Sequence, residues 1–436
     1  MPYDKLTRSA SIHRRGGWIA LAASVAWLAL GCGSSNLPPA NTSGAGGSLA
    51  GAGGGAVGAG GSATAGQGGA GIGGSIATDG GGVGGAAGSP VVDAGAGSDA
   101  ADARPPAVDR AATLEIMRRV ADYELTRFGT ATNTNWVRAV FYTGLLALYR
   151  AAGDAKYLTA TQNWGQTNNW RLGTDSSNSP RWADNQACVQ TFADLYLMNP
   201  VPANDVMLTT ARAAFDQMVA APMAGRVEWW WEDALFMAPP ALARAAQATP
   251  AKSAAYLNLL HTMWWDTKAY LFSDADQLMW RDNSFRNTSF WSRGNGWVVA
   301  GIARLLDALP ANDARRPDYE NLLGVMAGKL RTIQAADGFW RSDLLNPTRF
   351  PTPESSGTAF FCYGLAWGIH HGVLDRATYL DTALRAWAAL GTAVSAAGRL
   401  GWVQAVGAQP GPSNMADTND YATGAFMLAG TELLQL

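Results

Sequence analysis

The sequence predicts an all-α fold, an (α/α)6 barrel in which six outer helices surround six inner ones. The first observation is that apolar residues from Val108 to Leu436 recur mostly at helical spacing, with few alternating stretches. The second is that successive segments alternate in character. One is charged along a single face, and the next is apolar on nearly every side, as buried helices are. A plain α-solenoid is the competing architecture, although no fixed short repeat is visible.

We expect twelve helices, over residues 108–128, 135–152, 154–171, 184–198, 203–220, 232–247, 251–267, 294–309, 315–335, 355–371, 376–396 and 418–435. Start and stop residues support several of these boundaries. Asp154 opens one helix directly after Gly153, and Gly372 follows the end of another. Two polar inserts, 171–180 and 271–292, interrupt the pattern, and the second has the composition of a short hairpin. Long inserts in compact domains are often functional.

The chain divides by composition into a leader and one domain. Residues 33–107 hold 25 of the 51 glycines and no aromatic residue, so they cannot bury enough apolar surface to offset chain entropy. This stretch is predicted to be a disordered linker. Residues 108–436 hold 16 of the 18 tryptophans and are predicted to form the catalytic barrel.

Residues 1–32 are typical of an export signal. A basic start precedes the apolar run 18–30, which is too short to span a bilayer. Gly31 and Cys32 follow the run, in a sequence similar to a bacterial lipobox, although Ala29 and Leu30 reverse its usual order. We therefore expect an exported protein, anchored to a membrane through a lipid on Cys32 at the periplasmic or cell-surface side, or otherwise secreted.

Other partners and cofactors are not expected. A net charge of −2 gives no electrostatic reason to bind nucleic acid. Cys188 and Cys362 lie in apolar helical surroundings and are interpreted as buried thiols, with a disulfide between them left open. His370 and His371 close a helix, where they suit the negative end of its dipole. No metal-ligand or phosphate-binding motif is present, so we expect no metal and no cofactor.

Polar and aromatic residues meet where five of the apolar helices begin. These junctions are RWADNQ (181–186), EWWWED (228–233), FWSRGNGW (290–297), PESSG (353–357) and MADTN (415–419). The buried helices of such a barrel run parallel, so their N-termini converge on one end. The sequence thus predicts a cleft with acids, an arginine and tryptophan walls there, and flat aromatic faces beside hydrogen-bonding groups suit sugar rings.

Each junction also has a structural interpretation. Glu354 and Asp417 have the positions of ordinary helix N-caps. Gly294 and Gly296 permit close approach of a ligand to Arg293, or else belong to a turn with a structural salt bridge. The functional interpretation is favoured because five junctions coincide.

The domain resembles glycoside hydrolase family 105, the unsaturated rhamnogalacturonyl hydrolases, and more distantly family 88, the unsaturated glucuronyl hydrolases. The segments that carry the likeness are YTGLLALY (142–149), ADNQ (183–186), WWWEDALFMAPP (229–240), FWSRGNGWVVAG (290–301), PESSGTAFF (353–361) and GRLGWVQ (398–404). It extends from about Arg110 to the C-terminus.

The resemblance implies an (α/α)6 hydrolase that removes an unsaturated uronic acid left by a polysaccharide lyase. The family's reaction hydrates a vinyl ether: an acid protonates C4, and water attacks C5. By matching positions, Asp233 is the general acid/base and Asp184 the second active-site aspartate. Arg293 and Asn295 are expected to hold the substrate carboxylate. The remaining substrate-binding candidates are Trp182, Trp230, Trp231, Trp297 and Glu354.

One position departs from the family. Its members often carry a histidine between the sixth and eighth helices, where this chain has LMWRDN (278–283), and Arg281 or Asp282 is the candidate substitute. Two other functions compete: a different (α/α)6 glycosidase or lyase, and a surface sugar-binding lipoprotein without catalysis. The sequence leaves open which uronide and which leaving sugar are used.

Overall fold

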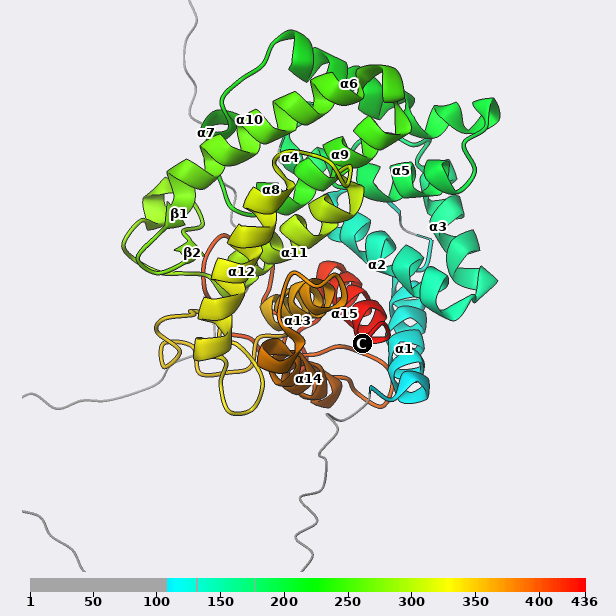
Figure 1. Cartoon of the computed structure of the whole chain (residues 1–436). Helices are drawn as coiled ribbons and strands as arrows, with labels where there is room; N and C mark the ends of the chain where they lie inside the picture. Colours follow the sequence, from blue (N-terminus) through cyan, green and yellow to red (C-terminus); the bar gives the residue numbers. More distant parts are fainter. Residues whose placement is uncertain (1–107, 131, 176) are drawn as a thin grey trace, which may run out of the picture. The chain divides into compact units, whose positions relative to one another are not determined.

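The computed structural model describes residues 108–130, 132–175 and 177–436, which fold as one helical unit (Figure 1). The predictions for residues 1–32 and 33–107, including the lipid on Cys32, lie outside the described residues. Within the described part, none of the helices combines the length and the apolar character that a membrane span requires.

The predicted (α/α)6 barrel is confirmed. The six inner positions are occupied by α2 (Trp136–Ala152), α4 (Ala183–Gln186) with α5 (Val189–Met198), α8 (Ala234–Met237) with α9 (Pro239–Ala248), α11 (Ser292–Ala308), α13 (Ser355–His370) and α15 (Asp420–Leu433). The outer helices are α1 (Arg110–Phe128), α3 (Ala155–Thr167), α6 (Thr209–Ala220), α10 (Ser253–Leu271), α12 (Arg316–Ile333) and α14 (Arg376–Thr392). Each inner helix packs against the next, and α15 packs against α2 to close the ring.

Glycines set the closest contacts between inner helices. A Cβ on Gly144 of α2 would lie 2.3 Å from the carbonyl oxygen of Gly424 on α15, so only glycine fits there. A Cβ on Gly364 of α13 would meet Val299 of α11 at the same distance. Residues 355–369 of α13 are all buried, which explains why that segment is apolar on every side. The small residues predicted to mark inner helices therefore let these helices approach closely.

The short elements lie between the helices. They are η1 (Pro202–Leu208), α7 (Gly225–Glu228), η2 (Pro250–Lys252), η3 (Asn283–Phe285) and the strands β1 (Phe272–Ser273) and β2 (Leu278–Met279). The two strands pair antiparallel, Phe272 opposite Met279, which confirms the hairpin expected in the second insert.

Several predicted helices differ from the structure. The one over 203–220 begins as η1 before α6, the one over 251–267 extends to Leu271, and the one over 376–396 ends at Thr392. The helix expected over 154–171 ends at Thr167, because Asn169 and Trp170 adopt left-handed backbone angles. The helix expected over 184–198 is divided into α4 and α5, and the one over 232–247 into α8 and α9. Pro239 begins α9 and cannot donate a backbone hydrogen bond, which explains the second interruption.

Candidate active site

Two aspartates and a buried glutamate gather at the N-terminal ends of the inner helices. Asp184 lies in the first turn of α4, and Asp233 directly precedes α8. The insert after β2 reaches the same place, since the backbone N–H of Glu232 donates to the carbonyl oxygen of Arg281 over 2.9 Å. The structure therefore brings together the two acids that the sequence singled out, beside Arg281.

The surroundings of these acids favour their protonated forms. Burial raises the pKa of Asp184 to about 7, and the charges of Asp233 and Asp175 act in the same direction. Burial also raises the pKa of Asp233, although the nearby cations Arg281 and Arg293 oppose it. The Oδ2 atom of Asp233 has no hydrogen-bond partner. A carboxyl group in such a setting can carry a proton near neutral pH, as a general acid must.

Glu232 is a third carboxyl group in this cluster. It has no exposed surface, neither of its carboxyl oxygens has a hydrogen-bond partner, and burial raises its pKa well above the usual range. Its Oε1 lies 1.6 Å from where a Cβ on Gly294 would stand. The glycine at position 294 therefore makes room for Glu232, whereas the sequence suggested that it admits a ligand.

Three tryptophans form a wall beside Asp184. Trp182 and Trp231 stack with ring centroids 4.7 Å apart, and Trp230 lies 4.9 Å from Trp231. The indole N–H of Trp182 donates to Oδ2 of Asp184 over 3.2 Å. Trp182 and Trp230 keep exposed surface, whereas Trp231 is nearly covered. The predicted aromatic wall is thus present, with two rings accessible to a sugar.

Arg293 occupies a different place from the one expected. Its guanidinium is buried and donates to the carbonyl oxygens of Gln404, Ala405 and Gly407, and to the hydroxyl of Tyr421. These bonds engage both terminal nitrogens, so the geometry does not support the predicted grip on a substrate carboxylate. Arg293 instead holds the 404–407 loop at the barrel end, and its charge lowers the pKa of Asp233.

Asn295 is also engaged within the protein. Its Oδ1 accepts the backbone N–H of Met279 over 2.8 Å, and its Nδ2 donates to the carbonyl oxygens of Met279 and Trp291. The side chain has no exposed surface. The expected substrate contact is therefore not supported, and Asn295 fixes the β1–β2 hairpin against α11.

Two further candidates are buried away from any substrate. Trp297 has no exposed surface and packs among Trp136, Phe236 and Phe360 inside the barrel. Glu354 caps α13, since its carboxylate accepts the backbone N–H groups of Ser356 and Gly357. For Glu354 the capping interpretation is the correct one, and for Trp297 the position is explained by core packing rather than by stacking on a sugar.

Asp175 is a member of the cluster that sequence reasoning missed. Its Oδ2 accepts the backbone N–H of Trp136 at the start of α2 over 2.9 Å, and its own N–H donates to Oδ1 of Asn185 over 2.8 Å. Its charge contributes to the raised pKa of Asp184. The residue lies in the polar insert 171–180, where one aspartate among serines and asparagines gives no distinguishing pattern.

Arg281 and Asp282 occupy different positions at the departure from the family pattern. Asp282 is buried, caps η3 through the N–H of Ser284, and binds Arg281 with Nη1 and Oδ2 2.5 Å apart. Arg281 extends over the ring of Trp230 at 5.1 Å, and its charge lowers the pKa of Asp184, Glu232 and Asp233. Both residues therefore act on the acids, because the charge of Asp282 raises the pKa of Glu232 and Asp233, and Arg281 is the cation of the pair.

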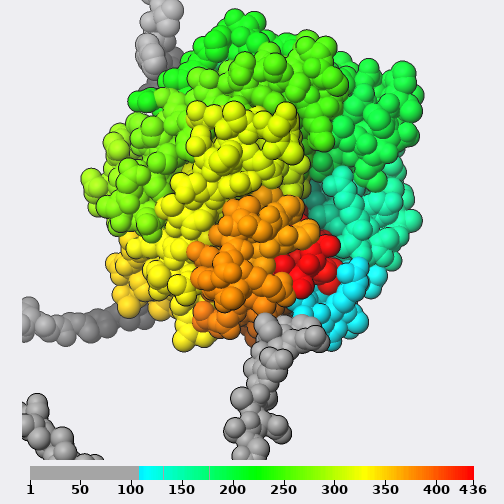
Figure 2. Space-filling view, viewed as in Figure 1, coloured from blue at the N-terminus to red at the C-terminus, as the bar shows by residue number. Residues whose placement is uncertain are grey.

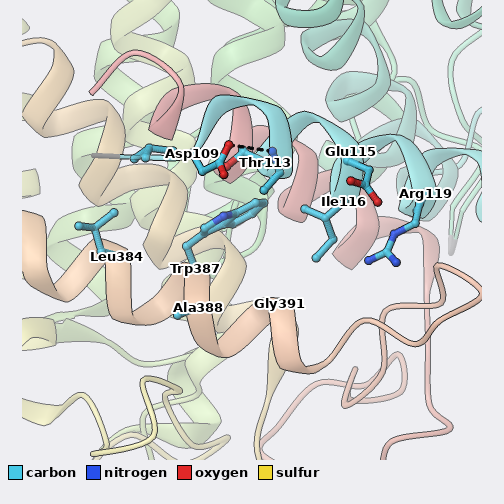
Figure 3. A pocket seen from close by; sticks show the side chains of 11 residues that line it. Asp109, Thr113, Glu115, Ile116, Arg119, Leu384, Trp387, Ala388 and Gly391 are labelled. Carbon is cyan, nitrogen blue, oxygen red and sulfur yellow. Dashed lines mark hydrogen bonds between the residues drawn. The ribbon is translucent and has the colours of Figure 1, made fainter. Parts of the chain in front are cut away.

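The pocket in Figure 3 is separate from this group of acids. Its volume is about 460 Å³, and it lies on the outside of the barrel between α1 and α14, beside Ile116, Leu384 and Trp387. Asp109, at its edge, caps α1 by accepting the N–H of Ala112. Its two acids, Asp109 and Glu115, belong to the outer helix α1 and its cap, so the aspartates at the barrel end remain the stronger candidate site.

Comparison with known families agrees with this geometry. The model of Glycosyl Hydrolase Family 88 matches residues 108–436, the whole predicted barrel. The chain belongs to glycosyl hydrolase family 88. It is therefore a glycoside hydrolase, and the predicted resemblance to families 105 and 88 is confirmed.

A curated relative of this family 88 chain is described as an unsaturated 3S-rhamnoglycuronyl hydrolase, from Formosa agariphila. The two are 33% identical over 328 residues, which is 70% of this chain and 85% of the relative.

Solved structures show the same barrel. A family 88 glycosyl hydrolase from Bacteroides vulgatus is 29% identical with a TM-score of 0.69, covering 75% of this chain and 99% of that one. A protein described as a polysaccharide lyase is 30% identical, also with a TM-score of 0.69, covering 74% and 96%. A possible family 105 member from Salmonella enterica, at 19% identity and a TM-score of 0.63 over 76% and 96%, shares the fold.

The barrel contains two cysteines, and neither belongs to the candidate site. Cys188 and Cys362 are both free and buried, which confirms the interpretation as inert thiols and answers the question of a disulfide. Burial raises the pKa of the Cys188 thiol to about 12, so neither its position nor its protonation suits a nucleophile in this family 88 enzyme.

Proposed function

We propose that this family 88 enzyme removes the 4,5-unsaturated uronic acid from the non-reducing end of oligosaccharides made by polysaccharide lyases. The observation that carries the proposal is the pair of aspartates with raised pKa values, beside two accessible tryptophan rings. The name of the curated relative supports an unsaturated rhamnoglycuronyl oligosaccharide as the substrate class.

In the proposed reaction, Asp233 is the general acid. Its proton adds to C4 of the C4=C5 double bond, and positive charge develops at C5 and the ring oxygen. Water attacks C5 and loses a proton to the Asp233 carboxylate, which restores the acid. The resulting hemiketal opens and releases the sugar beneath. The charge of Asp233 raises the pKa of Asp184, which shows that the two carboxyl groups lie close together. Asp184 is therefore the candidate for orienting the water.

The substrate carries its own carboxylate, which needs a cation. Arg293 has both terminal nitrogens bonded to protein oxygens. Among the described residues, the Arg281 guanidinium bonds only to Asp282, through Nη1, and its charge lowers the pKa values of the acids. We therefore assign the substrate carboxylate to Arg281. The exposed faces of Trp182 and Trp230 are the matching candidates for stacking against the sugar ring.

A lyase is the competing function, because one 30% identical structure is described as a polysaccharide lyase. Ultraviolet absorbance separates the two activities. A hydrolase of the proposed kind removes the absorbance of an unsaturated uronide, whereas a lyase creates it from intact polymer. We expect loss of absorbance from lyase-treated polysaccharide and none generated from the intact chain. Binding of unsaturated oligosaccharide with no change in absorbance would instead indicate a sugar-binding protein.

We further propose export with a lipid on Cys32, as the sequence of the leader predicts. Labelled fatty acid fed to cells that express the full chain should be incorporated into the protein, and Cys32→Ala should abolish incorporation and release the enzyme from the membrane fraction. Equal labelling of both forms would contradict this proposal and leave the enzymatic one untouched.

A further inference from the structure

Histidine and carboxylate side chains gather at the end of the barrel opposite the acids. His370 is the last residue of α13, His371 follows it, and Glu432 lies near the end of α15. One ligand atom from each of the three lies within 4.8 Å of the others. On α11, fourteen residues separate Arg293 from Asp307, which corresponds to about 21 Å of helix. The cluster is therefore distinct from the active site.

A fourth group, the carboxylate of Asp307, lies beside one member of this cluster. Oδ1 of Asp307, near the end of α11, lies 3.9 Å from Nε2 of His371, and it accepts the indole N–H of Trp367 over 2.7 Å. His370 and Glu432 are already in contact, with Nδ1 and Oε2 3.1 Å apart. Three inner helices thus contribute two imidazoles and two carboxylates to one place. In Figure 2 the red C-terminal residues reach the surface directly beside the orange segment.

The tautomer of His371 is fixed in a form that suits metal binding. Its Nδ1 lies 3.0 Å from the carbonyl oxygen of Trp367, which can only accept, so Nδ1 carries the hydrogen. The lone pair therefore resides on Nε2, which faces Asp307. The ring also stacks on Trp367 with centroids 4.2 Å apart. Metal-ligating histidines in proteins are typically oriented in this way, by donating the second ring N–H to a carbonyl.

Two carboxylates supply negative charge at this place, and Arg304 is a neighbouring cation in the same pocket. Asp307 and Glu432 bring two carboxylates to the C-terminal ends of the parallel helices α11, α13 and α15, where the carbonyl dipoles add partial negative charge. Two imidazoles with carboxylates suit zinc, nickel or copper, whereas magnesium and calcium prefer oxygen ligands alone. The side chains of His370, His371 and Asp307 are 37%, 34% and 31% exposed, so an ion can enter from solvent.

We propose that His370, His371 and Glu432, with Asp307 as a fourth ligand, form a binding site for a divalent transition-metal ion, with zinc as the best match. This goes beyond the sequence expectation, in which the histidines only complement a helix dipole and no metal is bound. The ion would tie together the ends of α11, α13 and α15 and so stabilise the barrel far from the acids. The proposal is independent of the proposed function.

Titration calorimetry tests the site. The full chain, produced without a histidine tag and treated with chelator, is titrated with zinc chloride. We expect one ion per chain in the micromolar range, a higher Tm with zinc, and no competition from magnesium. His371→Gln and Glu432→Gln should each weaken zinc binding by at least about tenfold.

His261→Gln is the matched control. His261 is also paired with an aspartate, Asp313, and with the hydroxyl of Tyr319, but it lies on α10 outside the cluster. This variant should bind zinc as the native chain does. Circular dichroism checks that each variant is folded. Absence of stoichiometric zinc binding by the native chain, or an equal loss in His261→Gln, would overturn the proposal.

Discussion

Two groups of acids lie shielded in the same barrel, and their pKa values are shifted in opposite directions. Asp194 of α5 accepts hydrogen bonds from Arg244 over 2.9 Å and Arg304 over 3.2 Å. Burial alone would raise its pKa, yet Arg244 and Arg304 lower the pKa of Asp194 to about 2. Asp184, on the preceding helix, has a pKa raised to about 7. One acid is therefore held ionised and the other is held close to neutral.

Both acids are shielded from solvent, so their hydrogen-bonding partners decide which of them is ionised. Around Asp194 the arginines donate to the carboxylate itself. Around Asp233 the cations are occupied elsewhere: Arg293 donates to the 404–407 loop, and Arg281 to Asp282. Their charges moderate the pKa of Asp233 without supplying hydrogen bonds to it. The first arrangement holds a carboxylate ionised, and the second leaves Asp233 able to carry a proton.

The largest expected effect is on catalysis. Asp233→Asn removes the proton donor, so turnover of an unsaturated disaccharide should fall by about 10²–10⁴-fold. The absorbance assay measures this loss, and circular dichroism should show an unchanged helical content. Asp274→Asn is the control, because its side chain is 89% exposed and pairs only loosely with Lys268. Turnover by Asp233→Asn within twofold of the native value would exclude Asp233 as the acid.

The next largest effect is expected at Asp194, on the free energy of unfolding. Asp194→Asn leaves Arg244 and Arg304 buried without the carboxylate that accepts their hydrogen bonds, so the free energy of unfolding should fall by about 3–5 kcal/mol. Asp233→Asn should have little such effect, because it removes an acid whose ionisation the fold already disfavours. Urea unfolding at pH 7 measures both. Equal losses in the two variants would mean that the two groups of acids do not differ as described.

A smaller effect should appear as a pH dependence of stability. Asp184 has a pKa near 4 when unfolded and about 7 when folded, so between these values the folded chain binds more protons. Its contribution is complete at acid pH and is lost as the pH rises through 7. The free energy of unfolding of Asp184→Asn, minus that of the native chain, should therefore be larger at pH 8 than at pH 4, by roughly 2–4 kcal/mol. Urea unfolding at both pH values checks the sign, and a constant difference would contradict it.

The features that were predicted correctly depend on residues close together in the sequence. Helical periodicity and the apolar segment 359–368 predicted the barrel, and the convergence of helix N-termini placed Asp184 and Asp233 together. Sequence reasoning failed where a side chain's role depends on a distant partner. The bonds of Arg293 to the 404–407 loop span more than a hundred residues, and no spacing rule reports them. Asp175 was missed for the same reason, because Trp136 lies far away in sequence.

The smallest predicted effect tests the role of Arg281. Lysine keeps the charge but lacks the planar fork that binds a carboxylate with two parallel hydrogen bonds, so Arg281→Lys should raise KM by about tenfold with kcat changed less. Arg286→Lys is the matched control, since that guanidinium also lies over a tryptophan, Trp280 at 5.0 Å. A loss in kcat alone would show that Arg281 acts on the acids through its charge, by lowering the pKa of Asp184 and Asp233, rather than by holding substrate.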